Sequence, residues 1–345
     1  MAFTRYLVRR IINSIIVVFA IIVLNFIVFR IIPGDPVSII LDPTMSQYKK
    51  LLLRHLFGLD RPLHEQFVLY LYNMLRGEWG FSFSPATRFQ PVSKVIMERL
   101  PNTVLLLLPA TILSIILGVA TGVYAGARRG EFADVASVTT GLTLYSLPTF
   151  WLALMLLFVF ASVLGWFPVG GTTHPVYYDS TTGKWVVVGD HPFGWLINVN
   201  PQLFFALDYL WHLILPMLTI TIVSFGYYLI LMRNTLVEVF AEDYILTARA
   251  KGLDEKTVLY KHALRNAMLP LITVTVLAFA GVISGAVLTE TVFSWFGMGR
   301  LVFDAVMNRD YPVLQAAFFM FGVLTVLANL IADILYACFD PRVRY

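Results

Sequence analysis

Long apolar runs alternate with shorter polar stretches along this 345-residue chain. Six runs reach the roughly 20 residues that a helix needs to cross a bilayer. Few charged residues interrupt them, so each run favours a membrane-spanning helix. The pattern predicts an all-α integral membrane protein with six transmembrane helices, within residues 1–32, 100–125, 135–164, 209–232, 270–289 and 313–339.

Small residues and a proline mark two of the predicted spans. The second span contains Gly118, Gly122 and Ala125, which would let a neighbouring helix approach closely. The third contains Pro148, which predicts a kink in an otherwise continuous helix. These positions are candidates for helix packing.

Two longer polar regions are predicted to lie outside the membrane. Residues 165–208 are polar, aromatic and turn-rich, and they form an external insertion. Within it, Val176–Tyr178 and Trp185–Val188 flank a turn and predict a β-hairpin. Residues 33–99 form an external amphipathic region that carries too many charges to cross, with apolar-faced segments at Gln47–Phe57, Leu63–Leu75 and Val92–Leu100.

The stretch 233–269 is the longest markedly charged run in the C-terminal half, with six lysines and arginines and five acidic residues. A charge at mid-bilayer costs about 2.5–3.5 kcal/mol, which predicts a loop in water. Its apolar residues recur at helical steps until Lys251–Gly252, which ends a first helix, and Asp254 fits the N-cap of a second. Such a loop suits docking onto another protein, and a stiff connector that touches nothing is the alternative.

The charge balance favours a membrane protein over a nucleic-acid binder. The chain is 58% hydrophobic and only 13% charged, and the residues behind its net charge of +4 form no single basic stripe. Outside the long region 33–99, most of the basic residues lie in the chain ends, at Arg128–Arg129 and in the charged loop. With an even number of spans, the positive-inside rule places both termini and the charged loop in the cytoplasm.

Sequence motifs for enzymatic chemistry are absent. No G-x-x-x-x-G-K-[ST] and no H-E-x-x-H occurs. The single Cys338 excludes an internal disulfide and a multi-cysteine metal site. We therefore expect no catalytic residue, no cofactor-binding residue and no metal site. The six histidines are dispersed along the sequence, at His55, His64, His174, His191, His212 and His262.

Asp333 is the charged residue most clearly inside a predicted span. It lies four residues after Asn329, so both occupy one helix face. An intramembrane acid is a functional candidate, as a gate for example. The favoured interpretation is a structural hydrogen bond at the cytoplasmic end of the bundle. Glu290, at the external membrane boundary, is a weaker candidate.

Several stretches of the chain resemble the permease subunits of ATP-binding-cassette (ABC) importers. The run TARAKG followed by RNAMLP is similar to their cytoplasmic coupling loop. Five further stretches resemble the dipeptide and oligopeptide family, and in particular its B-type membrane subunit: RYLVRRI, PGDP, TETVFSWFGMGRL, NRDYPVLQ and NLIADILYACFDPRVRY. This family also includes nickel and oligosaccharide importers. Leu246 stands where the loop motif has a leading glutamate, and Phe296 where many members have proline.

The resemblance implies roles for particular residues. In that family the coupling loop inserts into a groove on the ATPase, and we expect the small Ala248 and Gly252 to permit that fit. The residues expected to form the ATPase-coupling loop are Glu242, Asp243, Thr247, Ala248, Arg249, Ala250, Lys251, Gly252 and Asp254. The motif around Asn329 and Asp333 occurs whatever the cargo, which favours a structural role over a gate.

The resemblance also implies a function and a set of partners. The chain would form half of the translocation pathway of an importer for peptides or related solutes, in the cell membrane. Its partners would be a second permease, two cytoplasmic ATPases that bind ATP and magnesium, and an external substrate-binding protein; no cofactor is expected on this chain. The alternatives are an oligosaccharide or nickel-complex importer of the same family and, less favoured, a secondary transporter without ATPases.

Overall fold

A computed structural model of the protein describes residues 2–31, 48, 61–189 and 191–339. The predicted segment Gln47–Phe57 and the PGDP stretch lie almost entirely outside the described residues. The chain divides into two compact units, Met1–Pro101 with Leu301–Tyr345, and Asn102–Arg300. The predicted division into an N-terminal helix, an external region and a core from residue 100 stays a prediction.

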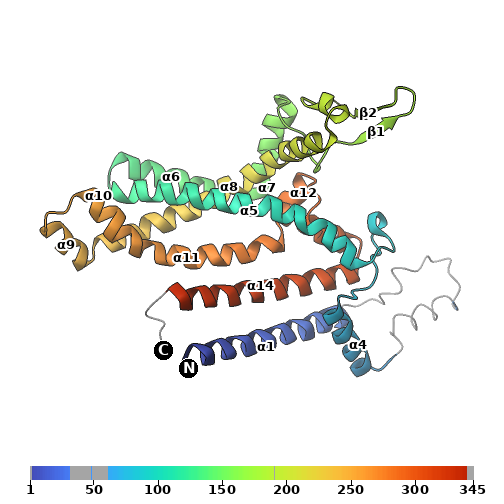
Figure 1. Ribbon diagram of the computed structural model, residues 1–345, viewed down its shortest axis with the longest axis horizontal. Coiled ribbons are helices and arrows are strands. Elements are labelled where there is room, and N and C mark those ends of the chain that lie inside the picture. Colours follow the sequence, from blue (N-terminus) through green and yellow to red (C-terminus); the bar gives the residue numbers. More distant parts are fainter. Residues whose placement is uncertain (1, 32–47, 49–60, 190, 340–345) are drawn as a thin grey trace. The chain divides into compact units, whose positions relative to one another are not determined.

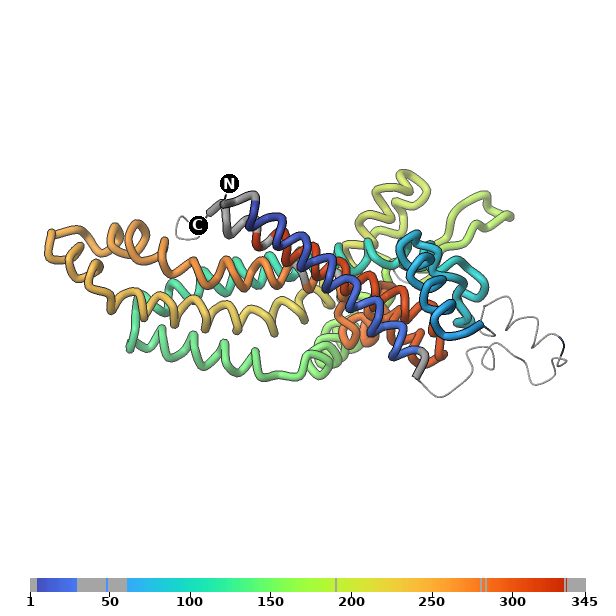
Figure 2. Tube along the Cα trace, turned by 90° about the horizontal axis from the view of Figure 1, so that it is seen from below, coloured from blue at the N-terminus to red at the C-terminus, as the bar shows by residue number. Residues whose placement is uncertain are grey.

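In the first unit, helix α1 (Ala2–Ile31) lies antiparallel beside helix α14 (Tyr311–Phe339), as both views show (Figures 1 and 2). The two helices approach closely at Gly322, where an added Cβ would lie 2.8 Å from the Ile21 side chain. Helix α4 (Leu63–Arg76) packs its apolar face against them through Met74, which is buried with Ile22 and Phe319. The predicted first and last spans and the amphipathic segment 63–75 are therefore confirmed as helices.

A buried aspartate fixes the chain just before α14. Asp310 is fully buried, and its Oδ2 accepts hydrogen bonds from the Ser82 hydroxyl (2.6 Å) and from the amides of Phe83 and Ser84 (both 2.8 Å). These donors lie near the short 3-10 helix η1 (Pro85–Thr87). Because a buried carboxylate is costly unless it is hydrogen-bonded, Asp310 has a structural role.

The second unit is built on helix α8 (Pro201–Phe240), which is longer at both ends than the predicted fourth span. Helix α5 (Val92–Ala127) packs on α8 through glycines: a Cβ added at Gly118 would lie 2.5 Å from Tyr228 Cβ, and one at Gly122 would lie 2.7 Å from the Leu229 carbonyl. The predicted role of these small residues is confirmed. Helix α5 also begins eight residues earlier than predicted, because Val92–Leu100 continues the same helix instead of forming a separate segment.

The third apolar run is not a single kinked helix. Helix α6 (Phe132–Ser146) ends before Pro148, and α7 (Thr149–Leu156) continues into a π-helix, η2 (Leu157–Val163), after a bend of 94°. Leu147 is extended (φ −70°, ψ 133°), as expected for a residue that precedes proline. The bend therefore lies at the predicted proline, but the run is a broken span or a re-entrant segment and not one continuous helix.

The fifth apolar run is also interrupted. Helix α11 (Leu264–Gly281) is followed by a 3-10 turn, η5 (Val282–Ser284), and a short helix, α12 (Val287–Val292). Gly285 breaks the run with a φ of +80°, and an added Cβ would lie 2.6 Å from the Gly299 amide nitrogen. Helix α13 (Met298–Met307) follows. Among the described residues, five helices are long and apolar enough to cross a membrane, or six if the bent pair counts as one span.

The external insertion contains the predicted hairpin. Strand β1 (Val176–Asp179) pairs antiparallel with β2 (Lys184–Val187), so that Val176 faces Val187 and Asp179 faces Lys184. Hydrogen bonds from Thr181 and Thr182 in the turn lower the pKa of Asp179 to about 2. A 3-10 helix, η3 (Gly194–Asn198), packs between the hairpin and α8. Its Leu196 and Ile197 are buried in a cluster with Phe204 of α8.

Candidate functional site: the charged loop between α8 and α11

A folded helical loop joins the ends of α8 and α11 (Figure 2). Helix α9 (Asp243–Ala250) begins after Glu242, and Asp243 lies in its first turn, where a carboxylate favours the helix dipole. The Thr247 hydroxyl donates to the Asp243 carbonyl (2.9 Å) within the same helix. Of the nine predicted coupling residues, all except Ala248 are exposed.

The loop has its own apolar core. Ile245 is fully buried and Ala248 is 6% exposed, and both lie in a cluster with Met232 and Leu236 of α8 and with Val258. Ala248 is therefore packed inside this chain, and its contribution to the fit of the loop on an ATPase stays a prediction. Its small side chain lets α9 pack on the chain's own helices, which holds α9 in a fixed position relative to α8.

The predicted helix–glycine–helix pattern is confirmed. Lys251 caps α9, and Gly252 adopts φ +77°, with no atom within 4 Å of an added Cβ. Gly252 is required by backbone conformation and not by crowding within this chain. Asp254 caps α10 (Glu255–Thr257) by accepting a hydrogen bond from the Thr257 amide (3.1 Å). Hydrogen bonds with the side chain of Thr257 and, to a lesser extent, with its backbone hold the pKa of Asp254 below its ordinary value. A π-helix, η4 (Val258–Ala263), leads into α11.

A charged pair closes the turn between α9 and α10. Arg249 Nε lies 2.9 Å from Glu255 Oε1, and a second guanidinium nitrogen lies 3.0 Å from Oε2. Arg249 also stacks over the ring of Phe240, 5.5 Å from its centroid. The pair lines a cleft of about 520 Å³ beside the end of α5. Both side chains are exposed, so the contribution to stability is small, about 0.2–1 kcal/mol.

A second ion pair anchors the end of α8 just before the loop. Arg233 donates two hydrogen bonds to Asp134 of α6, at 3.0 and 2.7 Å, and the Gly130 amide adds a third at 2.9 Å. The Asp134 side chain is 4% exposed. Sequence reasoning counted Arg233 only as a loop charge, because nothing in the sequence indicates that residues 99 positions apart meet.

Apolar side chains remain exposed on the loop. Leu246, at the position of the family motif's glutamate, is 68% exposed, and Tyr260 is 62% exposed. Tyr244 is 39% exposed, and its hydroxyl accepts a hydrogen bond from Asn266 (2.7 Å). Exposed apolar residues next to a packed loop core are typical of an interaction surface.

The acid predicted to lie inside the last span has a charged partner. Asp333 Oδ1 lies 2.9 Å from a guanidinium nitrogen of Arg10 on α1, and their side chains are 21% and 44% exposed. The contact joins α1 to α14 within the first unit. It agrees with a structural role for Asp333, and the choice between structure and gate remains a prediction. Asn329 lies one helical turn earlier on α14 and is exposed.

Glu290 is more deeply placed than the sequence predicts. It is fully buried in α12, outside the apolar spans, where its carboxylate accepts hydrogen bonds from the Thr103 hydroxyl (3.0 Å) and from the amides of Ala286 (3.2 Å) and Arg300 (3.0 Å). Burial raises its pKa, and these bonds oppose the rise. Glu290 organises the segment 286–300, where Gly297 leaves room for its carboxylate.

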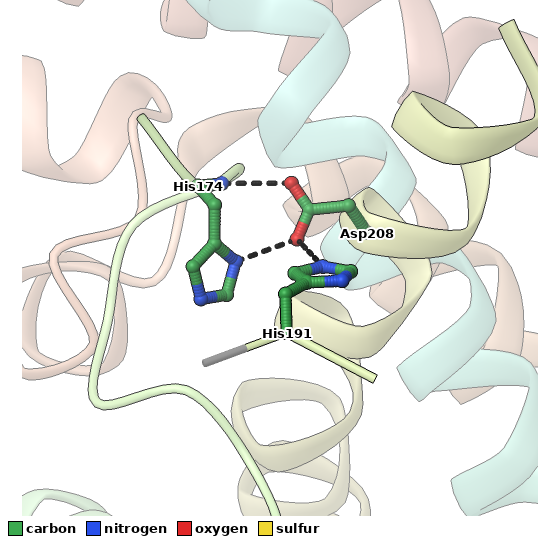
Figure 3. A group of neighbouring side chains, drawn as sticks. All are labelled: His174, His191 and Asp208. Atoms are coloured by element: carbon green, nitrogen blue, oxygen red, sulfur yellow. Dashed lines mark hydrogen bonds and ion pairs between the residues drawn. The ribbon is translucent and has the colours of Figure 1, made fainter. Parts of the chain in front are cut away.

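Three of the six histidines are not dispersed in space. His174, His191 and His212 each place a ring nitrogen within 3.1 Å of Asp208 Oδ1. Figure 3 shows His174 and His191 on either side of this carboxylate. Burial holds the pKa of His174 below its ordinary value, and its hydrogen bond to Asp208 opposes this shift. The only signal in the sequence was that His174 and His191 closely bracket the predicted hairpin.

The long apolar helices, with a charged helical loop between two of them, are typical of a multi-pass membrane protein. The chain belongs to the family described as binding-protein-dependent transport system inner membrane components, whose profile matches residues 118–345. The N-terminal profile of the same transport systems matches residues 3–107. The chain is therefore the permease subunit of an ABC importer, a transport component and not an enzyme.

Full-length relatives agree with this family. The oligopeptide transport system permease protein AppB of Bacillus subtilis is 37% identical over 340 residues, 99% of each chain. The di/tripeptide transport system permease protein DppB of Pseudomonas aeruginosa is 36% identical, with 95% of each chain covered. The glutathione transport system permease protein GsiC of Escherichia coli is 34% identical, with 99% of each chain covered.

Proposed function

We propose that this chain forms half of the translocation pathway of an importer for short peptides in the plasma membrane. The relatives above are named for oligopeptides, di- and tripeptides and glutathione, and all of these are small peptides. Its partners are a second permease, an external binding protein and two ATPases, which hold the ATP and magnesium. Uptake of labelled peptides into vesicles that contain the assembled importer tests the cargo. Uptake of an oligosaccharide or a nickel chelate instead would overturn it.

The loop from Glu242 to Asp254 is the proposed contact with the ATPase. The observation that carries this proposal is the combination of a rigid core and an exposed apolar surface. Ile245 and Ala248 fix α9 on α8, while Leu246 on the opposite face is 68% exposed. An ATPase that moves α9 would move α8 with it, because the packed core resists independent movement.

Leu246→Lys tests this contact without disturbing the loop core. Because Leu246 is exposed, the variant should insert normally, whereas a buried ammonium at an interface should reduce the ATPase that copurifies by about tenfold or more. Val188→Lys, 49% exposed in the external insertion, is the matched control and should copurify normally. Normal ATPase recovery and uptake with Leu246→Lys would mean that the loop is only a connector.

The proposed orientation places both termini and the loop in the cytoplasm. Single cysteines at Ser180, in the hairpin turn, and at Thr257, in the loop, test this after Cys338 has been replaced by serine. The cysteine at position 180 should react with an impermeant thiol reagent added outside intact cells, and that at position 257 should react only after permeabilisation. The reverse pattern would contradict the proposed topology.

A further inference from the structure

Two half-buried histidines and one buried aspartate at the base of the external hairpin form a set of metal-ligand atoms. His174 lies two residues before β1, His191 lies four residues after β2, and Asp208 lies in the second turn of α8. One ligand atom from each residue lies within 4.8 Å of the others (Figure 3). We propose that His174, His191 and Asp208 bind a divalent transition-metal ion, best matched by zinc, which clips the hairpin base to α8.

The distances fit a metal centre after a small rearrangement. His174 Nδ1 and His191 Nε2 lie 2.8 and 3.0 Å from Asp208 Oδ1. Zinc binds imidazole nitrogen and carboxylate oxygen at about 2.0–2.2 Å, which separates tetrahedral ligand atoms by about 3.3 Å. The two nitrogen–oxygen separations therefore need to grow by a few tenths of an ångström, while the two ring nitrogens, which lie within 4.8 Å of each other, approach about 3.3 Å. Two imidazoles and one carboxylate leave the fourth position for water, and they suit zinc better than calcium or magnesium.

Charge balance also favours a cation at this position. The Asp208 side chain is fully buried, and its ion-pair partners within the described part of the chain are histidines alone. Hydrogen bonds from these rings and from the His174 amide to Oδ2 (2.7 Å) satisfy the carboxylate oxygens but leave the negative charge without a permanent cation, and a buried charge is costly unless it is paired. The ring of His174 lies 4.7 Å, centroid to centroid, from those of His191 and His212, so a proton on any of them is close to the other rings. A divalent ion supplies the charge and uses neutral imidazoles.

The surrounding hydrogen bonds indicate which of the histidines would bind the metal and which would only hold the ligands in place. His212 Nδ1 lies 2.8 Å from the Asp208 backbone carbonyl, which only accepts, so this nitrogen carries the proton and His212 supports the site. The Phe193 amide donates to His191 Nδ1 (3.0 Å), so without metal the proton of neutral His191 lies on Nε2 and points at Asp208. Metal binding shifts that proton to Nδ1 and gives up the Phe193 bond, one hydrogen bond in exchange for a metal–ligand bond.

The position indicates a structural role for the ion. His174 and His191 enter and leave the hairpin, so one ion bound to both and to Asp208 would fix the insertion to α8. The side chains of His191 and Asp208 are 1% and 0% exposed, whereas His174 is 15% exposed and provides the route from solvent. A bound ion would therefore restrict opening of the hairpin without entering the spans.

The first measurement is metal content. The full chain is purified in detergent, its affinity tag is removed, and metal is stripped with a chelator. It is then equilibrated with zinc chloride and desalted, and zinc is measured by mass spectrometry. We expect about one zinc per chain, lost in His174→Gln and in His191→Gln and retained in the control His64→Gln, whose exposed histidine lies on α4. Equal retention in all four proteins, or none in the wild type, would overturn the proposal.

A second measurement remains informative if a variant folds poorly. Trypsin cleavage after Lys184, at the start of β2, requires local opening of the hairpin. In the wild-type chain, zinc at ten times its dissociation constant should slow this cleavage about tenfold, while cleavage after Lys256 in the other loop stays unchanged. Zinc that leaves both rates unchanged, or slows both equally, would refute the proposed clip.

Discussion

The crossing of α6 and α8 gives the sharpest test of the second unit. These helices meet at Gly141 and Gly226, and a Cβ added at Gly226 would lie 2.2 Å from the Gly141 carbonyl oxygen and 3.0 Å from Tyr145 Cβ. The nearest atom is backbone, which cannot rotate away as a side chain does. Gly226→Ala should therefore push the two helices apart by about 1 Å to restore ordinary contact distances.

Two effects determine the size of the change. Replacing a helical glycine by alanine stabilises a helix by about 1 kcal/mol, whereas overpacking costs about 1–3 kcal/mol. Separating the helices also weakens the van der Waals packing that holds membrane helices together. Gly281→Ala is the matched control, because Gly281 ends α11 with helical dihedral angles and has no atom within 4 Å of an added Cβ. The gain in helix propensity largely cancels between the two variants. The difference of about 1–3 kcal/mol in their free energies of unfolding therefore reports the steric cost.

The assay compares the two alanine variants in the same detergent. Thermal unfolding followed by size-exclusion chromatography should give Gly226→Ala a lower midpoint than wild type, and Gly281→Ala an unchanged or slightly higher one. Reduced uptake by the assembled importer should accompany the first change. If Gly226→Ala unfolds at the same temperature as Gly281→Ala, the close crossing of α6 and α8 is wrong.

Two further predictions concern the ion pairs. Asp134→Ala should destabilise the protein by about 2–3 kcal/mol. This is less than the 3–5 kcal/mol typical of a fully buried pair, because the Arg233 side chain is 23% exposed. Adding Arg233→Ala should restore part of the lost stability, whereas unfolding midpoints that fall additively in the double variant would show that the pair is not coupled. Asp333→Asn keeps one oxygen that can accept a hydrogen bond from Arg10 and should retain much of the uptake, whereas Asp333→Leu removes every acceptor and should lower the yield of assembled importer. An assembled complex of the asparagine variant without transport would indicate a gate.

Local patterns in the sequence were sufficient for many elements. Lys251–Gly252 and Asp254 predict the break and the cap in the charged loop, and both occur because each depends on the conformation of only a few neighbouring residues. The hairpin follows from its turn residues in the same way. The burial of Ala248 was not predicted, because the apolar face of α9 does not reveal whether it packs on this chain or on a partner.

The sequence by itself determined which segments favour lipid and which favour water, since the mean hydropathy of about 20 residues decides that partition without reference to the rest of the chain. Only the tertiary structure decided that the third apolar run turns by 94° at Pro148 and that the fifth breaks at Gly285. It alone also brought His174 to Asp208, 34 residues away. Such pairs form because the fold brings distant segments together, and a buried charge is stable only where that meeting supplies its partners.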